Sequence, residues 1–384
     1  MALKVNGVTV ISDTRDLTLT SNVTMIAVTS ANVNVTDESL IGSGYTIGGT
    51  KVFTSAGSAF GNTVFDNGAF LQFQFEGSEY PGTVSGYDSG GNAGPVRLDV
   101  INKFPFSADA SSSDVGELTA ARESVGGASS SAHGYTFGGL NPLITPAPSD
   151  IIDKFPFSSD TNATDVGELA NASYQLTGLS SPTNAYVGRG TPSPSSTTVQ
   201  KFPFASDTSA TAGATFPDYL THNGFNSGTG IHKDIGNGYF NHGRPACVVK
   251  LLKFSFITDT FQGAVSFGFT PGPVGRYGGG ASQSSTHGYY SGGKIPGSTN
   301  SNQIEKFPFA AEDTVSDVGD LFQARSRVAA QSSTVCGYTT GGYTGPPGTS
   351  MVNTIDKFSF ATDGNATDVG ELLCVTRSSV GAQV

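Results

Sequence analysis

The chain of 384 residues repeats itself with a period of about 50 residues. The tetrad Lys-Phe-x-Phe occurs six times, and successive copies are separated by 51, 47, 52, 53 and 51 residues. A Gly-Tyr pair followed by Gly-Gly, and the run Asp-Val-Gly-Glu/Asp-Leu, recur with it. A period of this length is typical of solenoids and propellers, where each repeat is one supersecondary unit that its neighbours must cover. The tetrads begin at Lys103, Lys154, Lys201, Lys253, Lys306 and Lys357.

Each repeat reads as about four short strands rather than as helices. The 51 Gly residues and the charged fraction of only 13% fit strands joined by turns. Because strand side chains alternate, Phe104 and Phe106 share one face of their strand. A small sheet cannot bury two such rings alone, so successive sheets must stack around an axis. The sequence therefore predicts an all-β fold, a β-propeller.

The repeat is out of phase with the chain ends. The first clear unit opens at Gly86 without the strand that should precede it, and the chain ends at RSSVGAQV (377–384) without the strand that should follow. We expect the C-terminal strand to pair with the first blade, which removes open sheet edges. This gives a six-bladed propeller over 81–384. The alternative is seven blades, because GYTIGG at Gly44 is followed by KVF at Lys51, which lies 52 residues before Lys103.

These repeats resemble the kelch family of β-propellers, with its Gly-Gly doublet, its acidic residue in the following strand and its Arg before the next unit. The resemblance covers residues 82–384. Kelch units usually carry a Trp in the outer strand, and this chain has none. We expect valines to take its place: Val115, Val166, Val318 and Val369.

Residues 1–80 differ in texture and are expected to form a small β segment. The opening KVNGVTVISDTRDL (4–17) indicates a hairpin turning at Gly7. This segment is similar to the short N-terminal module of bacteriophage tail fibres. The motifs K-F-P-F and N-A-T-D-V-G-E-L of the later repeats resemble repeats in virion proteins of marine phages that infect cyanobacteria. The resemblance implies a virion structural protein, a tail fibre, spike or capsid decoration, with residues 1–80 anchoring it to other virion proteins.

Charge and hydropathy narrow the class of partner. A formal net charge of −11 with no basic cluster disfavours nucleic acid. No signal peptide opens the chain and no 18-residue apolar run occurs, so we expect synthesis in the host cytoplasm, no membrane insertion and a final location in the virion. The cysteines Cys247, Cys336 and Cys374 lack metal-type spacing and are expected to be free thiols.

The sequence contains no known catalytic motif once the residues that belong to the repeat are set aside. The repeated Asp and Glu of the D-V-G-E-L run suit turn bonds and surface charge rather than acid–base catalysis. His133 and His287 share one repeat position that Cys336 fills elsewhere, which favours a structural role over a metal site. We expect no enzyme activity, no metal and no cofactor.

The repeat blurs between about residues 180 and 252, and loops freed from a template are candidates for binding. Aromatic and polar side chains there would suit a saccharide. The alternative is that these blades drifted or pack on another virion subunit. The candidate ligand-binding residues are Asp218, Tyr219, His222, His232, Tyr239, His242 and Arg244.

Three functions remain open from the sequence. The first is adhesion of a virion protein to a host surface glycan or protein receptor. The second is a purely architectural virion subunit without an external ligand. The third is an intracellular kelch-type module that binds a protein partner.

Overall fold

The computed structural model divides the chain into two compact units, Met1–Phe75 and Glu76–Val384, each described here by itself. In the first unit the structure describes six short strands. In the second it describes residues 82–143, 147–188, 190, 198–216, 228–229, 231–234, 236–244, 247–266, 276–295, 299–311, 314–345 and 350–384. In these parts of the chain no helix is long and apolar enough to cross a membrane.

The described strands of the first unit form three small antiparallel hairpins. β1 (Leu3–Val5) pairs with β2 (Val8–Ile11), which confirms the predicted hairpin at the start of the chain. β3 (Thr46–Ile47) pairs with β4 (Thr50–Lys51), and β5 (Thr63–Val64) with β6 (Phe70–Leu71). The run from Gly44 to Lys51 thus holds a short hairpin of the first unit and not a blade, so the seven-bladed alternative is wrong.

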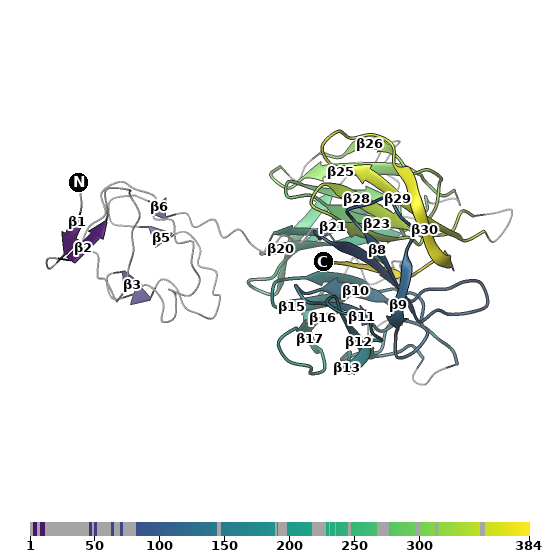
Figure 1. Ribbon diagram of the computed structural model, residues 1–384, viewed down its shortest axis with the longest axis horizontal. Coiled ribbons are helices and arrows are strands. Elements are labelled where there is room, and N and C mark those ends of the chain that lie inside the picture. The colour runs from purple at the N-terminus through teal and green to yellow at the C-terminus, as the bar shows by residue number, and fades with distance from the viewer. Residues whose placement is uncertain are drawn as a thin grey trace. The chain divides into compact units, whose positions relative to one another are not determined.

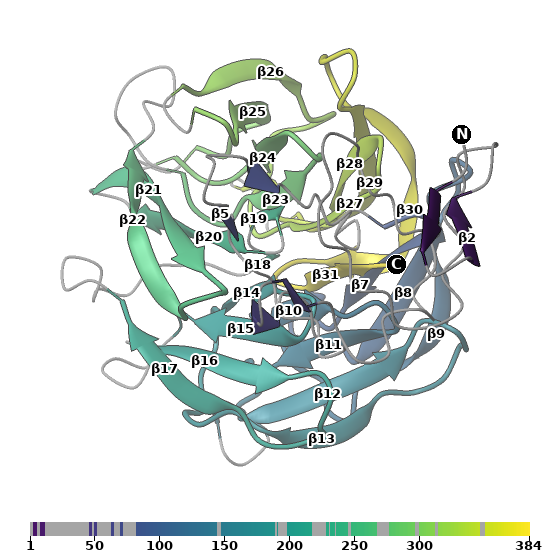
Figure 2. The ribbon, with the colours of Figure 1, turned by 90° about the vertical axis from the view of Figure 1, so that its left-hand side faces the viewer.

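The second unit is a ring of six four-stranded antiparallel sheets, which confirms the all-β, six-bladed propeller (Figures 1 and 2). From the axis outward, the first blade contains β31 (Val380–Gln383), β7 (Ser85–Ser89), β8 (Val100–Pro105) and β9 (Ser113–Glu117). The second contains β10 (Gly126–Ser129), β11 (His133–Phe137), β12 (Ile151–Pro156) and β13 (Thr164–Glu168). The third contains β14 (Thr177–Ser180), β15 (Asn184–Gly188), β16 (Thr198–Pro203) and β17 (Thr211–Thr215).

The remaining three blades follow in chain order. The fourth contains β19 (Ile231–Asp234), β20 (Asn237–Arg244), β21 (Cys247–Ser255) and β22 (Thr260–Ser266). The fifth contains β23 (Gly280–Gln283), β24 (His287–Ser291), β25 (Gln303–Pro308) and β26 (Ser316–Asp320). The sixth contains β27 (Ala329–Ser332), β28 (Cys336–Thr340), β29 (Val352–Ser359) and β30 (Thr367–Thr376).

The two ends of this unit meet in the first blade. β31, the last strand of the chain, pairs antiparallel with β7, with Val380 opposite Ser89 and Gln383 opposite Gly86. The Val84 amide also donates to the Val384 carbonyl at 2.7 Å. The ring is therefore closed by hydrogen bonds within one sheet, and β7 has no open edge.

A short segment lies inside the ring. β18 (Gly228–Thr229) pairs in parallel with the inner strands of the second and third blades, Gly228 standing opposite both Gly126 and Thr177. It also lies against β23, β27 and β31, and Figure 2 shows it near the middle of the ring. It belongs to the segment between β17 and β19, which is longer than the eight residues (118–125) between β9 and β10.

One aromatic arrangement holds every pair of neighbouring blades together. The two Phe rings of each Lys-Phe-x-Phe tetrad lie on the same face, as predicted, and pack on the Tyr of the preceding blade's Gly-Tyr pair. Tyr135, for example, lies 5.5 Å from Phe202 and 4.9 Å from Phe204, measured between ring centroids. Such pairs contribute roughly 0.5–1.5 kcal/mol each beyond area burial. The other clamped tyrosines are Tyr87, Tyr186, Tyr239, Tyr289 and Tyr338.

Two further contacts recur at the outer rim, one between neighbouring blades and one within the outer strand of a blade. The Lys of a tetrad forms an ion pair with an Asp of the next blade, and Lys357 to Asp109, at 2.7 Å, carries this pattern from the sixth blade to the first. The first Asp of the D-V-G-E/D run accepts a hydrogen bond from the Gly amide two residues later, as Asp114 does from Gly116 at 3.0 Å. This confirms the turn bonds predicted for these acidic residues. The other ion pairs are Lys103–Asp160, Lys154–Asp207, Lys201–Asp259 and Lys306–Asp363.

Candidate functional site

Backbone hydrogen bonds link the crossovers, the segments that run from the outer strand of one blade to the inner strand of the next. The Gln175 amide donates to the Ser124 carbonyl at 2.7 Å, and the Ser124 amide donates to that of Ser378 at 2.8 Å. The Ser378 amide donates to the Arg327 carbonyl at 2.8 Å, and the Arg327 amide to that of Gly278 at 2.5 Å. We call these five residues, Gly278, Arg327, Ser378, Ser124 and Gln175, the collar.

The collar depends on backbone conformation, not on side-chain identity. Its members have φ between 57° and 68°, the left-handed region, whether the residue is Ser, Gln, Arg or Gly. The residue before each collar member also varies: it is Glu123, Tyr174, Tyr277, Ser326 or Arg377. Because the main chain makes the bonds, the side chains of these positions can serve another purpose.

Charged and aromatic side chains gather at one part of the collar. The Arg377 guanidinium lies 5.6 Å from the centroid of the Tyr343 ring. Tyr343 follows the Gly-Gly pair after β28, and its backbone exchanges two hydrogen bonds with Ser326, beside Arg327. We call the following set the arginine–tyrosine cluster: Arg97, Glu123, Tyr277, Arg327, Tyr343 and Arg377.

The cluster holds more positive than negative charge. Arg97 forms an ion pair with Glu123 at 2.9 Å. Burial lowers the pKa of Arg327, and the neighbouring Arg377 lowers it further, whereas Glu123, Tyr277 and Tyr343 act in the opposite direction. One carboxylate therefore faces three guanidinium groups among these residues, and two like charges lie close enough to repel each other.

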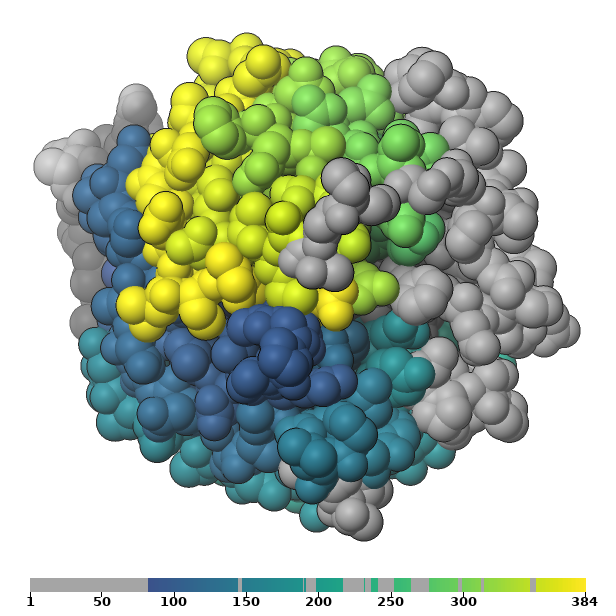
Figure 3. Space-filling model, turned by 90° about the vertical axis from the view of Figure 1, so that its right-hand side faces the viewer, coloured from purple at the N-terminus to yellow at the C-terminus, as the bar shows by residue number. Residues whose placement is uncertain are grey.

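Two of these guanidinium groups also present unused donors. The Nε atoms of Arg97 and Arg377 are buried and have no hydrogen-bond partner in the described part of the molecule. The side chains of Arg97, Arg327, Arg377, Tyr277 and Tyr343 are all half-buried, so part of each reaches solvent. Figure 3 shows a face of the propeller on which the dark blue start of the first blade adjoins the yellow end of the chain. Chemically, the cluster can bind an anion and stack a flat or ring-shaped group.

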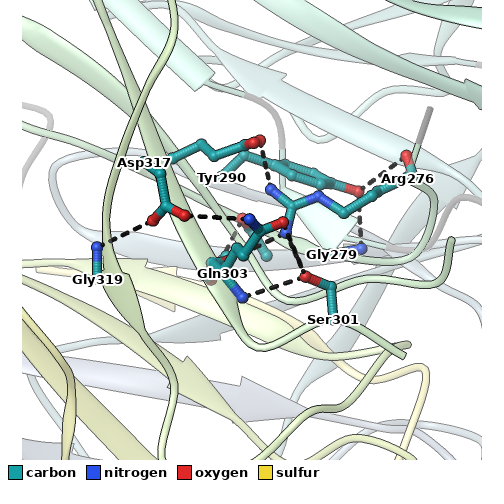
Figure 4. A network of polar contacts seen from close by, with 10 residues as sticks. Arg276, Gly279, Tyr290, Ser301, Gln303, Asp317 and Gly319 are labelled. Atoms are coloured by element: carbon teal, nitrogen blue, oxygen red, sulfur yellow. Dashed lines mark hydrogen bonds and ion pairs between the residues drawn. The ribbon is translucent and has the colours of Figure 1, made fainter. Parts of the chain in front are cut away.

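A second set of charges is fully buried and serves the fold. Arg122 and Asp153 are 0% exposed and 2.8 Å apart, and Arg325 with Asp356 repeats the pair in the sixth blade at 3.1 Å. In the third pair Arg276 binds Glu305. Arg276 also donates to Ser301 Oγ at 2.8 Å and to the Gln303 carbonyl at 3.1 Å, and Figure 4 shows these three residues. Burial raises the pKa of Glu305 to about 7, although Arg276 opposes the shift.

Where the arginine of this pair is missing, its acid is missing too. In the first blade Thr376 and Asn102 take the two places, and in the third Ser173 and Gln200 do. The side-chain oxygen persists as an acceptor: the Leu373 amide donates to Asn102 at 3.2 Å as the Thr119 amide does to Asp153 at 3.1 Å. Five of the six blades thus place a side-chain oxygen at this position, and a carboxylate occurs there only with its cation. In the fourth blade the apolar Leu252 takes the place.

The structure places only some of the residues predicted to bind a ligand. Asp218, Tyr219 and His222 lie outside the described residues. His232 lies on β19, and His242 and Arg244 lie on β20, where the backbone alone is described. Tyr239 is 0% exposed and packs on Phe307 and Phe309, so its ring belongs to the core between the fourth and fifth blades.

The arginine–tyrosine cluster was not among the sequence candidates. Its members occupy variable positions of the repeat, which lie between the recurring motifs and are not marked by the periodicity. The signal available was an excess of Arg and Tyr just after the Gly-Gly pairs and just before the inner strands. Only the closed ring brings residue 97 beside residue 123 and residue 377 beside residue 343.

The remaining titratable candidates have local structural partners. His133 and His287 begin β11 and β24, and burial lowers the pKa of both imidazoles. Cys336 is a buried free thiol and Cys374 a half-buried one. Within the described ranges, no group of His, Cys, Asp and Glu is arranged to hold a metal ion.

Comparison with models of known protein families and with curated proteins found no match. The class of protein therefore follows from the architecture: the second unit is a six-bladed β-propeller built from one repeated supersecondary unit.

Proposed function

We propose that the protein is a structural component of a bacteriophage particle that displays its propeller for adhesion to a host surface. The similarity of residues 4–17 to tail-fibre N-terminal modules supports this proposal, as does the resemblance of the repeat motifs to those of phage virion proteins. The division into two compact units fits an anchor and a display domain. The propeller is of the kelch-like type, and the first unit attaches it to other virion proteins.

The observation that carries the binding role is the arginine–tyrosine cluster on a rigid ring. A propeller closed at every joint holds such side chains in fixed positions, which reduces the entropy lost on binding. Binding is non-covalent, because the cluster offers donors and rings rather than a nucleophile beside a base. No catalysis and no cofactor is part of this proposal.

The test has two parts. Purified particles from a lysate that contains this protein are imaged by cryo-electron microscopy and analysed by mass spectrometry. The expected result is a six-bladed ring projecting from the tail or capsid. The full-length protein, labelled with a fluorophore, is then incubated with host cells, and saturable binding is expected.

Two other results would replace the proposal. A ring buried among other subunits, together with no binding to cells, would leave the protein as a purely architectural subunit. Particles that lack the protein altogether would overturn its virion role and leave an intracellular interaction module as the account.

A further inference from the structure

We infer that the arginine–tyrosine cluster binds an acidic saccharide, a sugar ring that carries a carboxylate or phosphate group. This inference rests on the proposed adhesion function and names the chemistry of its ligand. Its evidence is the local charge, the unused donors and the aromatic rings of the cluster.

The local charge calls for an anion. Arg377 precedes Ser378, whose amide donates to the Arg327 carbonyl at 2.8 Å, and its charge lowers the pKa of Arg327. Glu123 is already paired with Arg97 at 2.9 Å. An anion placed between the two arginines would relieve that repulsion and gain charge-assisted hydrogen bonds. The buried Nε atom of Arg377 is one donor available to it.

The size of the charge excess limits the ligand. The whole chain has a formal net charge of −11, so a long polyanion such as a nucleic acid is repelled by the rest of the surface. A group with one or two negative charges meets a local attraction without that long-range cost. This favours a short acidic determinant over a charged polymer backbone.

The rings determine the rest of the ligand. Tyr343 lies under the Arg377 guanidinium, and Tyr277 lies near Arg327. The apolar face of a sugar ring can pack on tyrosine while its hydroxyl groups bond to neighbouring polar groups. An acidic peptide would use the arginines but would need no aromatic neighbours, so the cluster fits a saccharide better.

The test compares sugars that differ in charge. The full-length protein is titrated in solution with mannuronate oligosaccharides, mannose 6-phosphate and neutral mannose oligosaccharides, and the affinities are measured by calorimetry. Binding is expected for at least one acidic sugar and at least about tenfold weaker binding for the neutral one. The two acidic probes separate a carboxylate from a phosphate ligand. A glutamate-rich peptide serves as a further probe.

The variants Arg327→Gln and Arg377→Gln identify the site. Gln175 occupies the collar position equivalent to residue 327 with φ of 59°, so glutamine is compatible with the backbone there. Each variant is expected to weaken acidic-sugar binding about tenfold or more. Lys103→Gln removes the same charge from the outer rim, where Lys103 pairs with Asp160, and is expected to leave binding unchanged. Circular dichroism and thermal unfolding establish that all three variants are folded.

The outcomes separate this inference from the proposed function. The inference is overturned if no acidic sugar binds, if the neutral sugar or the peptide binds as tightly, or if the arginine variants bind like the wild type. Should particles carry the protein and the arginine variants still attach to host cells, the adhesion function stands and the site lies elsewhere. Particles without the protein would instead remove the proposed function.

Discussion

The Arg122 guanidinium donates to the Asp153 carboxylate at 2.8 Å, and neither side chain is exposed to solvent. Asp153→Asn leaves a buried guanidinium without a counter-charge, so we expect it to reduce the free energy of unfolding by about 3–5 kcal/mol. The double variant Arg122→Thr/Asp153→Asn reproduces the Thr376 and Asn102 combination of the first blade. We expect the double variant to lose less free energy of unfolding than Asp153→Asn alone.

Chemical denaturation of Asp153→Asn, Arg122→Thr and the double variant measures this coupling. A coupling free energy of at least about 2 kcal/mol is expected. If the losses of the single variants simply add, the two residues do not act as a pair.

The glycine of the D-V-G-E/D run tests the contact between blades. A Cβ at Gly370 would lie 2.7 Å from the Ala110 carbonyl oxygen of the first blade, so the backbone must shift in Gly370→Ala. We expect a loss of about 1–3 kcal/mol in unfolding free energy, as for other overpacked positions. Gly213→Ala is the control, because Gly213 aligns with Val369, one residue before Gly370 in the repeat, and its nearest contact, the Val199 carbonyl oxygen, is 3.3 Å away. Equal losses in the two variants would mean that the joint plays no part.

Asp88 makes stability depend on pH. Its side chain is 0% exposed and accepts hydrogen bonds from Thr340 at 2.6 Å and Ser379 at 3.1 Å, and burial raises its pKa to about 7. The folded protein therefore holds this proton up to a higher pH than the unfolded chain does. The stabilisation is complete below pH 4 and is lost as pH rises to about 7, with a total of up to about 4 kcal/mol.

Asp88→Asn removes this ionisation while keeping an acceptor oxygen. We expect the variant to be more stable than the wild type at pH 8 and to show a flatter dependence of the denaturation midpoint between pH 4 and pH 7. Glu305 titrates in the same range, so a smaller slope remains in the variant. An unchanged slope would show that Asp88 is ionised throughout.

Removal of the last strand tests how the ring is closed. A chain that ends at Ser379 lacks β31 (Val380–Gln383) and exposes the edge of β7. We expect a lower unfolding temperature and concentration-dependent association through that edge. Differential scanning calorimetry and light scattering measure both effects. A monomer with wild-type stability would show that the other five blades hold the ring without this strand.

Much of the propeller could be predicted because the repeated positions show which side chains share a face and where each strand of a blade begins. The parity of Phe104 and Phe106 places both rings on one face, and both pack on Tyr338 of the sixth blade. The phase of the repeat assigns the missing inner strand to the end of the chain, where β31 lies. Periodicity could not assign the tyrosine to the neighbouring blade, because sequence spacing carries no information about contacts between repeats.

The candidate site could not be predicted for the opposite reason. Arg327 and Arg377 stand where the repeat varies, so no pattern marks them, and their proximity depends on the bends of two separate crossovers. The sequence search instead selected the most irregular stretch. One of its residues, Tyr239, keeps the aromatic role of the regular repeat despite the degenerate markers around it.

The closure of the first blade has a mechanical consequence. The Gly82 amide donates to the Ser332 carbonyl of the sixth blade at 2.7 Å, and β7 then runs between β31 and β8. A force applied to the chain before Gly82 pulls β7 along its own axis, so the bonds to both flanking strands are loaded in shear and must fail together. Such a connection resists pulling far better than one in which the bonds break one after another, which would suit the adhesive role proposed above.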